Sequence, residues 1–162
     1  MILYWPVGGA KYRISSHQRF AEHIAFAREN GLARVATLVR AQGKPFGADP
    51  RGGPWASVIK NDAAFAAIYA RQDLQRYIAI CETMRDALFD RDTAPGAQPE
   101  QLMGAAIPAF IVPGHDAAHA TSAARYLEEC LPQSRYWDVA VEAQTEDTTN
   151  PQVLEFLRAV KL

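Results

Sequence analysis

One continuous apolar run, from Ile107 to Pro113, constrains the fold of this chain more than any other segment. A run of this length that stops at a turn residue, here Gly114, is typical of a parallel strand buried on both faces. The segments after it alternate in pattern: a helix over 119–131, a strand over 135–141, and a helix that starts at 150–151. This order predicts a βαβα unit, and therefore a parallel sheet with a right-handed crossover.

The first part of the chain contains one more strand and a long helical excursion. The segment 1–5 is apolar and rich in β-favouring residues, so we expect a buried strand there, followed by a tight turn at Gly8 and Gly9. Residues 10–106 are too long for a simple crossover and predict an inserted helical subdomain. Its expected parts are helices over 16–29 and 32–41, a short helix capped by Asp62, a longer one capped by Asp73, and loops over 43–54 and 92–100.

Charge and composition exclude several classes of protein. The 17 Lys+Arg and 18 Asp+Glu residues give a formal net charge of -1, so the chain lacks the basic face of a general nucleic-acid binder. No apolar run approaches the ~18 residues of a membrane helix, and residues 1–10 lack the basic segment of a secretory signal. Cys81 and Cys130 lie on apolar stripes, which indicates reduced core thiols in a cytoplasmic protein.

The segment 107–119 has a recognisable pattern: an apolar strand that ends in Gly-x-Asp, with a histidine three residues after the aspartate. This pattern resembles the C-terminal half of the α/β-hydrolase superfamily. Three further segments support the resemblance: 1–9, the helix end at 130–132, and 153–157. The resemblance implies a truncated α/β-hydrolase-like fold, with a short parallel sheet, a helical cap over 10–106 and a closing unit over 107–162. It implies that Asp116 occupies the position of the catalytic acid.

Two parts of that family's catalytic machinery are missing from the sequence. No Gly-x-Ser-x-Gly elbow is present, and the serines at 15, 16, 57, 122 and 134 have no such context. The loop over 142–149, which follows the last expected strand, contains no histidine. A triad needs a nucleophile, a base and an orienting acid. We therefore expect a hydrolase-like protein, related to hydrolases of esters and other small carbonyl compounds, that is not catalytic alone.

Each candidate site residue has a structural alternative. Asp116 could cap the helix that starts near residue 117, and His119 could brace the turn by bonding to backbone. The motif His115-Asp-Ala-Ala-His119 resembles a metal-binding pair, but Gly114 places His115 in a turn and no third ligand is marked by spacing. We therefore expect no metal and no cofactor, and we keep a metal-dependent enzyme that uses both histidines as a minor alternative.

Ligand contacts are expected from His119, from Tyr12 after the Gly-Gly turn, and from Trp55 in a loop of the cap. His17 and His23 lie on an amphipathic helix and are interpreted as boundary packing. The strand at 1–5 has nothing before it in this sequence to cover its flank, which predicts association through that edge. We expect either a homodimer or a complementing chain that supplies the first half of a split hydrolase.

Overall fold

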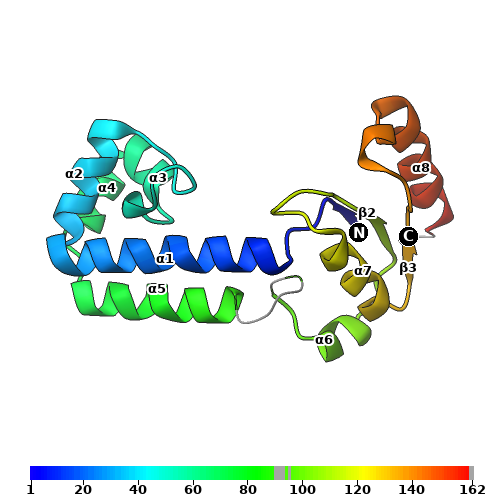
Figure 1. The fold of residues 1–162 in the computed structure, drawn as a ribbon, viewed down its shortest axis with the longest axis horizontal. Coiled ribbons are helices and arrows are strands. Elements are labelled where there is room, and N and C mark those ends of the chain that lie inside the picture. The colour runs from blue at the N-terminus through cyan, green and yellow to red at the C-terminus, as the bar shows by residue number, and fades with distance from the viewer. Residues whose placement is uncertain (90–93, 95, 161–162) are drawn as a thin grey trace. The chain divides into compact units, whose positions relative to one another are not determined.

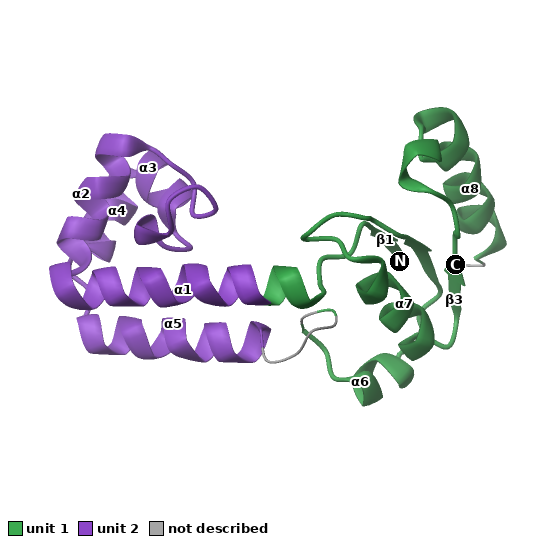
Figure 2. Ribbon diagram, viewed as in Figure 1, with its two compact units in different colours: residues 1–13, 91–162 green, residues 14–90 purple. Residues whose placement is uncertain are grey.

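The computed structural model describes residues 1–89, 94 and 96–160. The chain forms two compact units, which Figure 2 shows in different colours. Residues 1–13 and 91–162 make the first, here called the sheet unit, and residues 14–90 make the second, the helical unit. The protein is a mixed α/β structure, mostly helical, with one small parallel sheet in its described part.

The sheet has the order β1-β2-β3, and both pairings are parallel. The strands are β1 (Ile2–Tyr4), β2 (Ala109–Val112) and β3 (Ser134–Tyr136). Leu3 pairs with Ile111, and Ile111 pairs with Tyr136, so β2 is the central strand. All four β2 residues are fully buried, which confirms the strand predicted from the apolar run.

Alternate residues of β2 pack against helices on opposite faces of the sheet (Figure 1). Ala109 and Ile111 contact α7 (Thr121–Cys130), through Ala123, Ala124 and Leu127. Phe110 and Val112 contact α8 (Glu146–Ala159), where Phe156 stacks on Phe110 with centroids 5.5 Å apart. The predicted apolar face of the helix after β2 is therefore confirmed. The short helix α6 (Pro99–Met103) also packs on α7.

The helical unit contains the predicted helices and one unpredicted one. Its elements are α1 (Ala10–Asn30, which begins in the sheet unit), α2 (Leu32–Gln42), the 3-10 turn η1 (Pro50–Gly52), α3 (Ala56–Asn61), α4 (Ala63–Tyr69) and α5 (Leu74–Leu88). Asp62 caps α4 by accepting from the Phe65 N–H, and Asp73 caps α5 by accepting from the Arg76 N–H. Both caps are as predicted. The thiols of Cys81 and Cys130 are free and buried, also as predicted.

Several predicted boundaries and burials are wrong. Helix α1 starts at Ala10, so Tyr12 lies in its first turn and not in a loop. Strand β3 ends at Tyr136, because the chain then turns into η2 (Val141–Ala143), and α8 already starts at Glu146. β1 is only partly buried, with Ile2 40% and Tyr4 50% exposed, because it is an edge strand. Of the loop predicted over 92–100, residues 92, 93 and 95 lie outside the described residues, and α6 begins at Pro99.

None of the helices in the described part of the chain combines the length and apolar content needed to cross a membrane.

Candidate functional site

Asp116 lies just beyond the carboxyl end of β2, in the segment that leads to α7. Its Oδ1 accepts the backbone N–H groups of Ala118, at 2.7 Å, and His119, at 2.8 Å. These bonds close a turn before the helix, and the N-cap of α7 is Ala120, which has no side-chain cap. The prediction that Asp116 caps this helix is therefore wrong, because the chain needs one more turn between strand and helix.

His119 is bonded to Asp116. Its Nδ1 lies 2.9 Å from both carboxylate oxygens, and this bond is the main reason that the pKa of Asp116 is lowered. The interpretation of His119 as bonded to backbone is wrong, because the turn places the carboxylate directly beside its ring. A carboxylate can only accept, so Nδ1 carries the proton and Nε2 is left as a hydrogen-bond acceptor. The ring also packs on Trp5, with centroids 5.7 Å apart.

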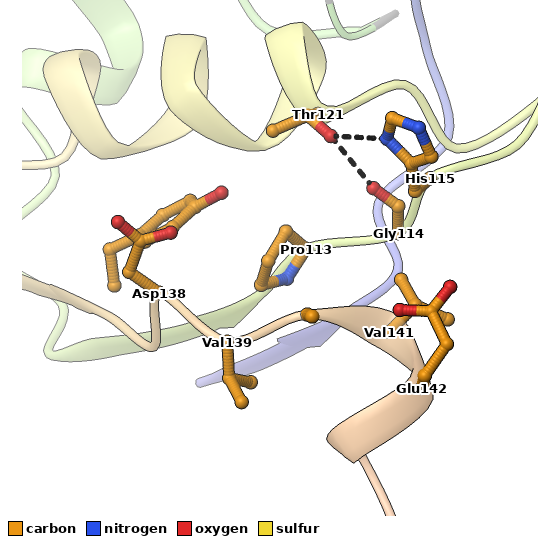
Figure 3. Close-up of a pocket in the computed structure, with 10 residues that line it drawn as sticks. Pro113, Gly114, His115, Thr121, Asp138, Val139, Val141 and Glu142 are labelled. Atoms are coloured by element: carbon orange, nitrogen blue, oxygen red, sulfur yellow. Dashed lines mark hydrogen bonds between the residues drawn. The ribbon is translucent and has the colours of Figure 1, made fainter.

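His115 belongs to a second set of hydrogen bonds at the same edge, drawn in Figure 3. The Thr121 hydroxyl donates to the Gly114 carbonyl at 3.1 Å, and its oxygen lies 3.3 Å from Nδ1 of His115. Because the hydroxyl hydrogen is used on Gly114, Nδ1 of His115 must be the donor in the second bond. His115 therefore has the same tautomer as His119, with Nε2 free to accept.

Two hollows adjoin these residues, and both lie within the sheet unit. The first measures about 370 Å³ and is lined by His115, Thr121, Asp138 and Glu142 among others (Figure 3). The second measures about 450 Å³. The residues that line it are Ala10, Lys11, His115, Asp116, Ala117, Ala120, Thr121 and Ser122. His115 and Thr121 line both hollows, so the two hollows are neighbours.

The polar groups around the two hollows differ. The first is rich in acceptors, since it has Nε2 of His115 and the carboxylates of Asp138 and Glu142, although Asp138 also pairs with Arg125 at 2.9 Å. The second has donors in the Lys11 ammonium and the Ser122 hydroxyl, opposite the Asp116 carboxylate. This arrangement suits a small polar ligand that both accepts and donates hydrogen bonds.

Gln144 is a residue that the sequence analysis missed. Its side chain accepts from the Trp5 indole N–H at 2.7 Å and donates to the carbonyls of Pro113, at 2.8 Å, and Val139, at 3.3 Å. These bonds join the ends of β1 and β2 to the loop after β3. Trp5 itself has φ +49°, a left-handed conformation that is rare for a bulky residue. Gln144 therefore holds the carboxyl ends of β1 and β2 against the loop after β3.

The remaining predicted ligand residues are not brought together. Tyr12 is half-buried in the first turn of α1, in the sheet unit. Trp55 belongs to the helical unit, where it precedes α3 and packs on Phe65 with centroids 6.4 Å apart. Neither residue lines either of the two hollows described above.

The arrangement contains an acid and two imidazoles. The Thr121 hydroxyl lies beside His115 but donates its hydrogen to the Gly114 carbonyl, so His115 does not act on it as a base in this conformation. Within the described residues, neither His115 nor His119 is hydrogen-bonded to a serine. Ser122, whose hydroxyl lines the second hollow, lies in the first turn of α7 and not on a strand-to-helix elbow. The described residues also contain no group of three or more His, Cys, Asp or Glu placed to hold a metal ion. Comparisons with protein-family models, curated proteins and solved structures give no significant match.

Proposed function

We propose that the sheet unit is a hydrolase-like binding module, which holds a small carbonyl ligand at the carboxyl edge of its sheet and does not turn it over alone. The observation that supports this most directly is the Asp116 carboxylate, held by three donors just beyond the central strand and next to two hollows. Open parallel sheets bind ligands at this edge. On this proposal the fold is a truncated α/β-hydrolase-like fold, and Asp116 stands in the acid position.

The roles of the polar groups follow from their hydrogen bonds. Asp116 fixes the tautomer of His119, and Nε2 of each imidazole accepts a ligand hydroxyl or amine. Lys11 and Ser122 donate to a carbonyl or carboxylate oxygen of the ligand. Attack on that carbonyl needs an activated nucleophile, and this sequence has no Gly-x-Ser-x-Gly elbow to supply one.

A second candidate is one half of a split hydrolase, completed by a partner chain that supplies the nucleophile. The free edge of β1 supports it, because within the described residues β1 pairs only with β2, and Ile2 and Tyr4 remain exposed. A second copy of this chain would cover the same edge, so a homodimer is the alternative occupant. The free, buried thiols of Cys81 and Cys130 support a reducing compartment such as the cytoplasm.

The test combines an activity assay with a binding assay on the purified chain. We expect no hydrolysis of p-nitrophenyl acetate above background and no stoichiometric labelling by serine-directed phosphonates. Binding is followed with a set of short-chain esters and carboxylic acids, by the NMR shifts of the His115 and His119 imidazoles. A binder should shift both resonances in the wild type, lose affinity in Asp116→Asn, and behave normally in the control Asp147→Asn on the exposed start of α8.

Two results would contradict this function. One is ester turnover that survives repurification and disappears in Asp116→Asn, since the chain would then be an enzyme in its own right. The other is a complete screen in which no compound shifts either imidazole, since the two hollows would then have no small-molecule role.

A further inference from the structure

His23 is the most completely buried ionisable imidazole in the described part of the chain, and the proposed function does not use it. It lies on α1 in the helical unit and has no exposed surface. Its Nδ1 is 3.1 Å from the Arg51 carbonyl oxygen, and its Nε2 is 2.7 Å from the Tyr77 hydroxyl on α5. The interpretation of this residue as boundary packing is wrong, because it sits in the core of the unit.

The two hydrogen bonds specify one neutral tautomer. The Arg51 carbonyl can only accept, so Nδ1 carries the hydrogen and donates it. Nε2 therefore has a lone pair, which accepts the Tyr77 hydroxyl hydrogen. A second proton on the ring would enter at Nε2, and the Tyr77 hydroxyl would then have to turn its hydrogen away and accept from the ring.

Among the residues that the structure describes, no anion is placed to compensate a charge on this ring. The ring contacts Tyr77 of α5, with centroids 5.7 Å apart, and Phe46 of the segment after α2, with centroids 6.3 Å apart. Burial raises the pKa values of Tyr77 and of its neighbours Tyr69 and Cys81, so these groups stay uncharged. The nearby carboxylate of Asp49 is already bound by both Nε and Nη2 of Arg51, at 2.9 and 2.8 Å. Burial accordingly lowers the pKa of His23.

The segment over 43–55, here called the strap, covers the ring. It runs from the end of α2 to the start of α3, and its outward residues, such as Lys44, Ala48 and Arg51, are exposed. Gly53 passes directly over the imidazole, where a Cβ would lie 2.3 Å from Cε1 of His23. Only a glycine fits there, and its φ of +74° requires one as well. Gly53 is itself buried, so the ring lies beneath the strap with no path to water in this conformation.

We propose that His23 is an acid-sensitive latch, and that protonation of its ring releases the strap from α1. The imidazolium gains hydration only if the layer above it moves, and the strap is the part of its surroundings with the least regular structure. It contains four glycines and three prolines over residues 43–54, and its described secondary structure is the single 3-10 turn η1. The helices on the other sides of the ring have their own buried faces and remain folded.

The test is hydrogen exchange of the strap amides, expressed as protection factors, between about pH 7.5 and pH 5, which spans the ordinary histidine pKa. One proton taken up on opening lowers protection by up to about tenfold per pH unit. We expect this decline for residues 49–56 in the wild type and in His17→Gln, whose histidine lies exposed on the same helix. His23→Gln should make strap protection independent of pH.

A direct titration keeps the latch testable if His23→Gln does not fold. The imidazole NMR resonance of His23 in the wild type should change with the same midpoint as strap opening, below the ordinary histidine pKa of about 6.5. Three results would overturn the latch. The first is strap protection that does not change with pH. The second is protonation of His23 while the strap amides stay protected. The third is loss of protection in α1 and α5 with the same pH dependence, which would mean that the whole unit unfolds.

Discussion

Replacing Gln144 with alanine tests how the carboxyl edge of the sheet is held together. The substitution removes the acceptor of the Trp5 indole N–H and the donor to the carbonyls of Pro113 and Val139. Pro113 is buried, so its carbonyl would lose its partner in a place that water reaches poorly. A buried polar group left without a partner costs about 1–3 kcal/mol, and the half-buried indole adds about 1 kcal/mol. We therefore expect a loss of about 2–4 kcal/mol.

The measurement is unfolding by urea and by heat, followed by circular dichroism and by tryptophan fluorescence, to which Trp5, Trp55 and Trp137 all contribute. A loss of this size lowers Tm by roughly 5–15 °C in a chain of this length. Gln75→Ala is the matched control, because Gln75 lies on the exposed face of α5 and has no side-chain bond to lose. We expect a change within about 0.5 kcal/mol for this control.

Gln144→Glu separates the hydrogen bonds from the packing. The glutamate side chain has almost the same shape and still accepts from Trp5, but it cannot donate to the two carbonyls and brings a negative charge against them. We expect it to destabilise the protein at least as much as Gln144→Ala. The reasoning would be refuted if Gln144→Glu left the stability unchanged, or if Gln144→Ala lost less than about 0.5 kcal/mol. Gln144 would then contribute only packing.

Three further predictions follow from the structure. Light scattering at micromolar concentration should give about twice the chain mass of 17.9 kDa, and Ile2→Asp at the β1 edge should give the monomer; a wild-type monomer would contradict this. Protein purified without chelator should contain less than one zinc per chain; a full equivalent lost in both His115→Ala and His119→Ala would contradict this. Tyr77→Phe should cost about 1–3 kcal/mol by removing the donor to His23. Tyr69→Phe should cost less, because the buried Tyr69 hydroxyl neighbours the Tyr77 hydroxyl and is not bonded to His23. Equal losses in the two variants would contradict the last prediction.

Local sequence signals predicted the long elements well. The apolar run at 107–113 gave the buried central strand because β2 has neighbours on both sides and helices on both faces. Asp62 and Asp73 marked two helix starts because a capping bond spans only three residues. The helices α3 and α6 were not predicted, since six and five residues are too few to define an apolar periodicity.

Only those parts of the candidate site that involve residues close together in the sequence could be predicted. Asp116 and His119 are three residues apart and were both expected in the turn before the helix, each bonded to backbone. The bond between their side chains was not predicted, because it depends on the conformation of that turn. Gln144 could not be predicted, because its partners Trp5 and Pro113 lie 139 and 31 residues away. The burial of His23 likewise depends on Arg51 and Tyr77, which lie 28 and 54 residues away.

The bonds of Gln144 also bear on what chemistry the proposed site can perform. The proposed α/β-hydrolase-like fold would place a base on the loop after the last strand. In this chain the Gln144 amide of that loop is bonded to Trp5, Pro113 and Val139. Any base must then come from the segment before α7, where Nδ1 of His119 is bound to Asp116 and Nε2 is left to accept. An imidazole in that state can take a proton from a ligand, but without a positioned hydroxyl it has no nucleophile to activate. On the proposed function, these residues bind and orient a ligand within a single chain.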